Sequence, residues 1–471
     1  MVFSNGQQEA FNALMSGKNV FLTGEAGTGK SFVIQEFRKR TSRRVLVCAP
    51  TGIASINVGG CTIHRAFQIP PNELFPETIL EPTKEVKMAQ TIIIDEISMC
   101  RLDVFLAVAK IIQKIGRLVQ LVVVGDFYQL PPVLVPKEKD FFCGLWKNFL
   151  SKNYTVTDMN EPYAFLTETW NKFNFRYIEL TEQMRQRDDV SFYDVLNRVR
   201  VGDATVLPWI QKHSAKEPNE NAIFLCGRNK TASTINESRL EEIPSHSREY
   251  RAIRRGDVRN NDVPVDYLIT LKPGCRVMTV VNDTSRDRLY VNGSLGTVRE
   301  LLDDGIIVDF DNGNLGVVIR HYNWEIPKYE IKTKTITEFR SLKRYDKKGR
   351  PKLTPWKIYR KEDTLPSEEH LSDGTPLIRY TDKKVFDIVP CGTFIQLPIK
   401  LAYAITIHKS QGKTFDAVTL DPECFATGQL YVALSRVRRV TDLYLKKPLS
   451  SSSLITSTLV KDFYQKISEK K

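Results

Sequence analysis

Four short apolar runs rich in β-branched residues lie within the first 130 residues of the chain. They occupy residues 19–22, 45–48, 91–94 and 121–124. Continuous apolar runs of this length are typical of strands buried on both faces, as in a parallel sheet covered by helices. The segments 31–40 and 102–115 between them space their apolar residues with helical periodicity. The pattern predicts an α/β domain over residues 1–150.

The pattern changes near residue 295. Residues 295–298, 305–310 and 315–319 predict short strands, and Asp311-Asn312-Gly313-Asn314 between the last two predicts a hairpin. An α/β pattern returns near residue 395. We therefore expect a small β module at residues 295–395, inserted in a second α/β domain of residues 151–294 and 396–450. Residues 451–471, which follow, are expected to be a frayed tail.

Composition and charge narrow the class of protein. The 471 residues are 42% hydrophobic and 26% charged, as in a folded globular protein, and the net charge of +13 favours a polyanionic partner. No apolar run approaches the ~18 residues that a membrane span needs. Neither a signal nor a transit peptide pattern opens the chain, and the eight cysteines lack metal-ligand spacing. We expect a cytoplasmic or nucleoplasmic protein with no membrane partner and no zinc site.

A phosphate-binding motif, GEAGTGKS at residues 24–31, lies between the first predicted strand and a predicted helix. Its glycines allow backbone N–H groups to surround phosphates. Lys30 would reach the β and γ oxygens, and the Ser31 hydroxyl would bind Mg²⁺. The candidate nucleotide-binding residues of this loop are Gly24, Gly27, Thr28, Gly29, Lys30 and Ser31. The alternative, a glycine-rich loop without a ligand, is weak because the flanking strand and helix both match.

Polar residues follow the third and fourth apolar runs. Asp95 and Glu96 come at the end of one run, which places two carboxylates at the carboxyl edge of the sheet. Asp95 would hold Mg²⁺, and Glu96 would orient or deprotonate the attacking water. Gln129 follows the next run and is a candidate sensor of the γ-phosphate. Alone, either segment would more simply be a solvated turn, and the phosphate motif makes the catalytic interpretation the stronger one.

An ordered series of motifs from residue 7 to residue 438 resembles a known family. The motifs are Gln7, GEAGTGKS, APTGIA (49–54), TIH (62–64), DEISM (95–99), GDFYQLPPV (125–133), LTEQMRQ (180–186), AYAITIHKSQGKTFD (402–416) and YVALSRVR (431–438). The chain resembles superfamily 1B DNA helicases of the branch with RecD, the phage Dda helicase and the petite-integration-frequency helicases, and it is most similar to the last group. Residues 100–103, CRLD, depart from the signature of that group.

The resemblance implies two RecA-like P-loop NTPase domains with an SH3-like β module inserted in the second. ATP and Mg²⁺ would bind between the domains, with Gln7 on adenine and Gln411 and Gly412 beside the nucleotide. Arg185 and Arg436, from the second domain, match the arginine fingers of the family. Without that pattern, each arginine would more simply form a surface salt bridge. A wedge-type insertion is expected near residues 68–87, with Phe75 as its aromatic candidate.

The resemblance also implies contacts with single-stranded DNA. The matching positions are Thr51, Thr62, His64, Thr406, His408 and Lys409, and Phe67 is a further candidate for nucleic-acid binding. Phe67, Phe127 and Tyr128 can stack on bases, and packing in the core is an equal alternative for these rings. The basic arm at residues 328–361 has thirteen Lys or Arg residues and three acidic ones. This arm is either a grip on duplex or displaced strand or a solvated hairpin.

Together these features predict a monomeric, ATP-dependent DNA helicase that moves 5′ to 3′ on single-stranded DNA and unwinds duplexes. The polarity follows from the resemblance. Its partners would be single-stranded DNA, junctions of single and double strands, and proteins of replication or repair. Two alternatives stay open: an RNA helicase or a translocase that does not unwind, and a non-catalytic nucleic-acid clamp.

Overall fold

The computed structural model describes most of residues 3–469. Gaps fall at residues 52–53, 56–57, 70–73, 75–79, 135–148, 155–159, 186–188, 259–262, 284, 286, 340–343, 346–350, 353–357 and 361–377, and the rest of residues 327–391 is described by its backbone alone. The wedge candidate Phe75 and the side chains of the basic arm at 328–361 therefore lie outside the described residues.

A six-stranded parallel sheet forms the first α/β unit, with strand order β3-β2-β4-β5-β1-β6. Its strands are β1 (Val20–Gly24), β2 (Val45–Ala49), β3 (Cys61–Thr62), β4 (Thr91–Ile94), β5 (Gln120–Val124) and β6 (Arg176–Leu180). Its helices are α1 (Asn5–Met15), α2 (Lys30–Arg40), α4 (Ile63–Phe67), α5 (Lys84–Met88), α6 (Leu102–Lys114), α8 (Glu168–Lys172) and α14 (Thr458–Ser468). The strands run parallel because a helix-containing connection joins each to the next.

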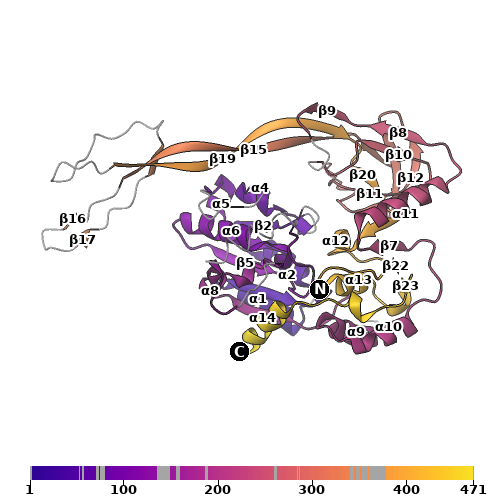
Figure 1. The fold of residues 1–471 in the computed structure, drawn as a ribbon, viewed down its shortest axis with the longest axis horizontal. Coiled ribbons are helices and arrows are strands. Elements are labelled where there is room, and N and C mark those ends of the chain that lie inside the picture. Colours follow the sequence, from indigo (N-terminus) through magenta and orange to yellow (C-terminus); the bar gives the residue numbers. More distant parts are fainter. Residues whose placement is uncertain are drawn as a thin grey trace.

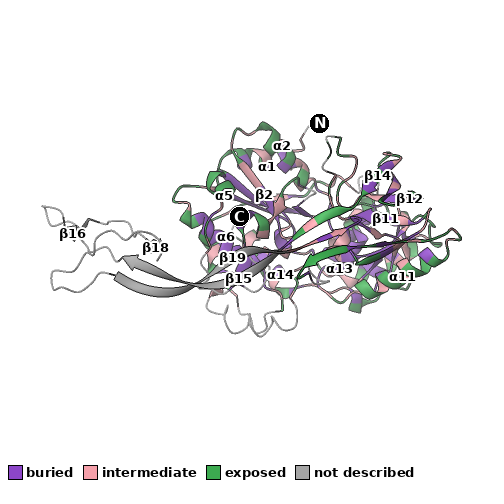
Figure 2. Cartoon of the chain, turned by 90° about the horizontal axis from the view of Figure 1, so that it is seen from above, coloured by how far each residue is buried: buried purple, intermediate pink, exposed green. Residues whose placement is uncertain are grey.

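Alternate residues of each central strand enter two cores. On β5, Val122 and Val124 pack with α1 and α2, whereas Leu121 and Val123 pack with α4, α6 and α14. This two-sided burial explains why the strands are continuously apolar. Figure 2 shows the buried strands between helices whose outer faces are exposed.

The second α/β unit contains a smaller parallel sheet of order β21-β7-β22-β23. Its strands are β7 (Ile223–Cys226), β21 (Ala404–Thr406), β22 (Val418–Leu420) and β23 (Leu443–Leu445). Its helices are α9 (Val190–Arg200), α10 (Leu207–His213), α11 (Asn229–Glu241), α12 (Ile407–Ser410) and α13 (Gln429–Leu434). The two units lie side by side, with α12 and α13 toward the first unit (Figure 1).

The inserted module is antiparallel and begins earlier than expected. Its main sheet has the order β14-β13-β12-β11-β20, formed by β11 (Arg276–Thr279), β12 (Leu295–Leu301), β13 (Gly305–Phe310), β14 (Val317–Arg320) and β20 (Ile399–Leu401). A second pair, β8 (Arg248–Arg251) and β10 (Leu268–Leu271), shares its core. The predicted boundary at residue 295 is wrong because β11 pairs with both β12 and β20. The hairpin of β13 and β14 is confirmed, and the SH3-like fold stays a prediction.

A long two-stranded ribbon leaves this module. The strands β15 (Tyr322–Phe339) and β19 (Ile378–Gln396) pair along their whole length and extend past the first unit (Figure 1). Shorter strands complete this part: β9 (Ile253–Gly256), β16 (Arg344–Tyr345), β17 (Pro351–Lys352) and β18 (Ile358–Arg360). The expected basic arm therefore includes one strand of an antiparallel ribbon.

Two segments differ from the expected domain division. The strand β6, expected in the second domain, pairs with β1 at the edge of the first sheet. The helix α14, expected to be a frayed tail, packs Val460 and Phe463 into the core of the first unit. Both predictions fail for the same reason. Each segment has only a few apolar residues among polar ones, so its sequence pattern does not show which core it joins.

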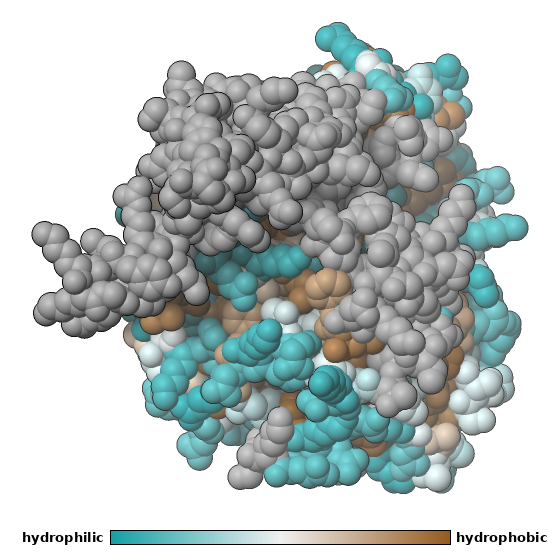
Figure 3. All heavy atoms as spheres, turned by 60° about the vertical axis from the view of Figure 1, so that its left-hand side comes forward, coloured by the Kyte–Doolittle hydropathy of each residue, from teal (hydrophilic) through white to brown (hydrophobic). Residues whose placement is uncertain are grey.

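Among the described residues, no helix is long and apolar enough to span a membrane, and the six described cysteines are free. The face seen in Figure 3 is largely hydrophilic outside the grey residues, with apolar patches between the polar side chains. The same described part of the chain has no cluster of three or more metal-binding side chains.

The packing of α14 predicts that removal of one aromatic ring strongly lowers the stability of the protein. Phe463 contacts Phe165 at 4.2 Å and Phe127 at 5.2 Å between ring centroids. Phe463→Ala would leave a cavity there, and we expect it to lower the free energy of unfolding by about 3–5 kcal/mol. Urea denaturation followed by tryptophan fluorescence measures this change. The exposed neighbour Gln465→Ala is the control, and equal midpoints for the two variants would contradict the assignment of α14 to the core.

Candidate functional site

The loop between β1 and α2 has a backbone that favours glycine. Gly24, Gly27 and Gly29 have positive φ angles of 138°, 89° and 86°. A Cβ on Gly24 would lie 2.3 Å from the Leu180 carbonyl oxygen, so no larger residue fits between β1 and β6. Gly29 precedes the first residue of α2, so the loop ends at a helix N-terminus, as in phosphate-binding loops.

Lys30 lies inside this loop with its ammonium group turned back on the backbone. Its Nζ donates to the carbonyl oxygens of Gly24 and Glu25, each at 2.8 Å. Burial lowers the pKa of Lys30, and the carboxylates of Asp126, Glu96 and Asp95 oppose that shift. The loop also places the buried Thr28 and the exposed Ser31 at the start of α2. The Lys30 ammonium group is therefore positioned to bind an anionic ligand.

Asp95 and Glu96 leave β4 at the same sheet edge. The Asp95 carboxylate accepts a hydrogen bond from the Glu96 backbone N–H at 2.9 Å, and Glu96 has a left-handed φ of 52°. Burial and then the charge of Glu96 raise the pKa of Asp95 to about 7. Burial also raises the pKa of Glu96, against the pull of Lys30. Two desolvated carboxylates at this edge suit a divalent cation, and a phosphate-loop Mg²⁺ site takes its remaining ligands from phosphate and water.

Hydrogen bonds between side chains connect Glu96 to the second unit. Gln411, directly after α12, donates from Nε2 to Glu96 Oε2 at 3.0 Å and to Gln129 Oε1 at 3.3 Å. Gln129 and Gln411 are both buried, and Gly412 next to Gln411 has a φ of 77°. The structure therefore brings together three candidate site residues, Glu96, Gln129 and Gln411.

Gln7 lies against the phosphate loop from the side of α1. Its Nε2 donates to the Thr28 carbonyl oxygen at 3.3 Å, and its Oε1 accepts from the Ser4 N–H in a capping box. This position beside the loop is compatible with the predicted contact with adenine.

The two candidate arginine fingers are adjacent, but they differ in setting. Arg185 donates to the Ser435 carbonyl oxygen at 2.9 Å. Arg436 is only 1% exposed, and its guanidinium donates to the carbonyl oxygens of Val432, Ser410 and Lys413. Burial and the neighbouring Arg185 lower the pKa of Arg436 to about 9. Arg436 therefore also holds α12 and α13 together.

The prediction that Arg185 belongs to the second domain is wrong. Arg185 follows β6 of the first sheet and lies in the connection between β6 and α9. The strand β6 had been assigned to the wrong side of the boundary, and Arg185 was assigned with it.

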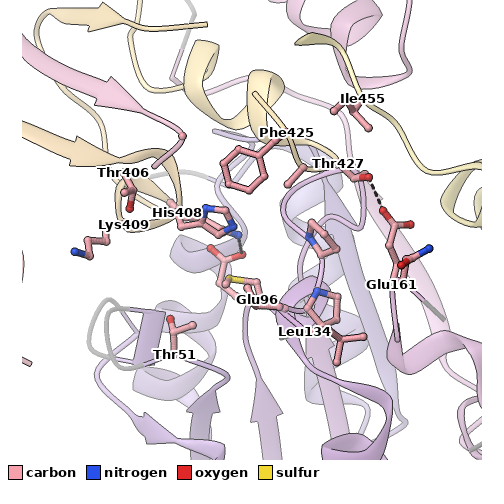
Figure 4. A pocket seen from close by; sticks show the side chains of 18 of the residues that line it. Thr51, Glu96, Leu134, Glu161, Thr406, His408, Lys409, Phe425, Thr427 and Ile455 are labelled. Atoms are coloured by element: carbon pink, nitrogen blue, oxygen red, sulfur yellow. Dashed lines mark hydrogen bonds between the residues drawn. The ribbon is translucent and has the colours of Figure 1, made fainter. Parts of the chain in front are cut away.

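A groove of about 760 Å³ lies between the two units. Thr51 and Glu96 of the first unit line one side, and Thr406, His408 and Lys409 line the other (Figure 4). Burial lowers the pKa of His408, so its imidazole is neutral near pH 7. Lys409 is half-buried, and burial lowers its pKa too. Four of the seven predicted nucleic-acid positions thus line one groove.

The other three positions do not line this groove. Phe67 is fully buried in the first core, so the prediction that it stacks on bases is wrong and core packing is the correct alternative. Phe127 is buried in the same core. Thr62 caps α4, where its hydroxyl accepts from the Arg65 N–H at 3.2 Å, and His64 Nδ1 lies 3.0 Å from the Ile69 carbonyl oxygen. The helical spacing of α4 alone does not show which face is covered.

Three residues that sequence analysis gave no role also contact these sites. The Ala26 N–H of the phosphate loop donates to the Tyr431 hydroxyl at 2.9 Å, and Gln183 Nε2 donates to the Ala26 carbonyl oxygen at 3.0 Å. Phe425 lines the groove (Figure 4) and is 51% exposed. The Arg228 guanidinium lies 5.0 Å from the centroid of its ring. Tyr431 and Gln183 belong to recognised motifs, and that membership was the available signal. No pattern marked Phe425.

A phosphate loop, one buried and one partly buried carboxylate, and a second parallel unit in contact with them define the P-loop NTPase fold with two RecA-like domains. The PIF1-like helicase family model matches residues 2–207, and the UvrD-like helicase C-terminal domain model matches residues 401–439. Over this first region the chain is similar to PIF1-like helicases. The departure at residues 100–103 lies inside the region that this model matches.

Known relatives match along the whole chain. The ATP-dependent DNA helicase PIF1 of Danio rerio is 30% identical over 93% of this chain and 60% of that protein, so this chain spans about three fifths of that relative. The ATP-dependent DNA helicase Pif1 of Campylobacter jejuni is 27% identical over 96% of each chain. The crystal structure of Bacteroides Pif1 with ADP-AlF3 and single-stranded DNA is 27% identical, covers 100% of this chain and 98% of its own, and has a TM-score of 0.74.

The burial of Arg436 predicts that two adjacent arginines have different structural effects. Arg436→Ala removes a buried guanidinium and its three hydrogen bonds to backbone carbonyl groups, so we expect it to destabilise the second unit by at least about 2 kcal/mol. Arg185→Ala removes one hydrogen bond at a partly exposed position and is the matched control. Thermal unfolding without nucleotide measures both. Equal unfolding temperatures for the two variants would contradict the structural role of Arg436.

Proposed function

We propose that the chain is an ATP-dependent DNA helicase that moves 5′ to 3′ along single-stranded DNA and separates duplex strands. One observation carries the proposal. The short segment from Thr406 to Gln411 lines the groove with its first residues and donates a hydrogen bond to Glu96 with its last. A single element of about one helical turn therefore touches both the hydrolytic carboxylate and the surface for the DNA strand.

At the nucleotide site, the roles follow from position and charge. Lys30 would exchange its two loop carbonyl partners for β and γ oxygens of ATP. Ser31 and Asp95 would hold Mg²⁺, which would neutralise phosphate charge. Glu96 orients the attacking water and accepts its proton. Gln129 and Gln411 lie beside Glu96, where they respond to the γ-phosphate. Arg185 and Arg436 lie close enough to Glu96 to contribute to its electrostatic environment and stabilise charge on the transferred group.

In the groove, a polynucleotide would meet two kinds of contact. The Lys409 ammonium and the hydroxyls of Thr51 and Thr406 suit backbone phosphates, which fix position without reading sequence. The exposed ring of Phe425 suits stacking on a base. This combination favours a single strand, because its bases are free to stack.

Movement along the strand would come from opening and closing of the two units. ATP binding draws the second unit toward the phosphate loop, and product release lets it return. Because α12 belongs to the second unit, each cycle shifts Thr406 and Lys409 relative to Thr51. Support comes from the Bacteroides relative, whose structure contains both ADP-AlF3 and single-stranded DNA.

The same proposal includes the polarity, the duplex junction as substrate, proteins of replication or repair as partners, and a location inside the cell.

The decisive experiment is an unwinding assay on duplexes with a 5′ or a 3′ single-stranded tail, in DNA and in RNA, with and without ATP. The proposal predicts strand separation only on the 5′-tailed DNA duplex and only with ATP. Separation of the 3′-tailed duplex would overturn the polarity, equal activity on RNA would overturn the choice of DNA, and ATP hydrolysis without separation would indicate a translocase.

Lys30 supplies a prediction that separates hydrolysis from DNA binding. Lys30→Ala removes the cation from the phosphate loop, so ATP hydrolysis should fall by at least about a hundredfold. Lys30 is not among the residues that line the groove, so affinity for a labelled oligonucleotide should stay within twofold. Steady-state ATPase assays and fluorescence anisotropy measure the two effects. A variant that hydrolyses ATP at the wild-type rate would refute the assignment.

Phe425 supplies the converse prediction. Phe425→Ala removes a stacking surface from the groove, and because stacking contributes about 1–3 kcal/mol per base, affinity for single-stranded DNA should fall roughly five- to a hundredfold. Phe425→Trp keeps an aromatic face and should retain binding. Fluorescence anisotropy with an oligothymidylate probe measures both variants. Unchanged affinity of Phe425→Ala would place the strand elsewhere.

A further inference from the structure

The last helix of the chain reaches the nucleotide site through one tyrosine. Tyr464 lies on α14, after the last recognised motif, and its ring is partly exposed while its hydroxyl lies inside the first unit. The hydroxyl accepts a hydrogen bond from the Phe127 backbone N–H at 3.1 Å and lies 3.0 Å from Thr23 Oγ1. Its own proton is directed at Asp126 Oδ1, 3.5 Å away. With Thr23 as a donor, these contacts use the one proton and both lone pairs of the phenol.

The partners of this hydroxyl lie on two strands that carry nucleotide-site residues. Thr23 lies on β1, directly before Gly24 of the phosphate loop. Asp126 and Phe127 belong to the turn after β5 that leads to Gln129. Because β1 and β5 are neighbours in the sheet, one hydroxyl fixes the end of one strand relative to the end of the other. It therefore sets the distance between the phosphate loop and the candidate γ-phosphate sensor.

The turn after β5 is also held from the second unit. Asp126 accepts two hydrogen bonds from Arg200 on α9, both at 3.0 Å, and both side chains are buried. The rings of Tyr464 and Tyr128 stack at 4.9 Å with an interplanar angle of 5°. The Arg200 guanidinium lies 4.6 Å from the centroid of Tyr128 and 5.6 Å from that of Tyr464. Burial and the Asp126 carboxylate raise the pKa of Tyr464, so its hydroxyl keeps the proton it donates.

We propose that Tyr464 is a positioning residue for ATP hydrolysis, whose hydroxyl holds the phosphate loop and the 126–129 turn at the separation that catalysis needs. The residue touches neither nucleotide nor Mg²⁺ and acts through Thr23, Asp126 and Phe127. In this arrangement α14 is a part of the catalytic unit. This inference rests on the proposed ATPase function.

Tyr464→Phe tests the hydroxyl alone, because it keeps the ring that stacks on Tyr128. The matched control is Tyr250→Phe, since the buried Tyr250 hydroxyl donates to the carbonyl oxygens of Leu302 and Gly305, at 2.9 and 3.0 Å, in the inserted module. For each full-length variant, kcat and KM for ATP are measured with saturating oligothymidylate, together with the unfolding temperature. A nucleotide-free anisotropy titration with the same oligonucleotide reports on the groove.

We expect Tyr464→Phe to lower kcat roughly three- to tenfold, with KM for ATP and oligonucleotide affinity within twofold of wild type. Tyr250→Phe should lower the unfolding temperature and leave kcat within twofold. A wild-type kcat in Tyr464→Phe, or an equal loss of kcat in both variants, would overturn the positioning role while leaving the proposed function intact. A wild-type chain without ATPase activity would instead refute the proposed function itself.

Discussion

The hydrogen bond from Gln411 to Glu96 joins the two units where the proposed nucleotide site and the proposed strand-binding groove meet. Glu96 is partly buried near Lys30, and desolvation raises its pKa, so its protonation and orientation depend on the polar groups around it. Gln411 is one of those groups, and it belongs to the segment that lines the groove. A displacement of that segment therefore changes the surroundings of Glu96, the carboxylate proposed to activate water. This dependence couples hydrolysis to DNA binding in the proposed mechanism.

The parallel sheets make this contact available. In each unit the strands end at one edge, and the loops at these edges supply Lys30, Asp95, Glu96 and Gln129 from the first unit. The second unit supplies Thr406 from the end of β21 and Gln411 from the turn after α12. Buried connections such as the Arg200 pair with Asp126 and the Tyr431 contact with Ala26 hold the edges against each other. Because these groups are desolvated, small changes in geometry have large electrostatic effects.

The sequence predicted those parts of the site that depend on local chemistry. The phosphate loop and the carboxylates after β4 follow from glycine spacing and the end of an apolar run, and the structure brings both to one sheet edge. The parts that depend on tertiary packing escaped prediction. The residue type of Phe67 does not show whether its ring faces solvent or the core. Its burial depends on packing with α5 and α6. Arg185 follows a strand whose sheet could not be assigned, and α14 carries only a few apolar residues in a polar tail.

The most direct test of the account is the steady-state rate of ATP hydrolysis by the purified chain, with and without a single-stranded oligonucleotide. If the segment from Thr406 to Gln411 couples the groove to Glu96, the oligonucleotide should raise kcat at least about tenfold. Gln411→Ala should hydrolyse ATP slowly whether or not the oligonucleotide is present. A wild-type rate that is the same in both conditions would contradict the coupling.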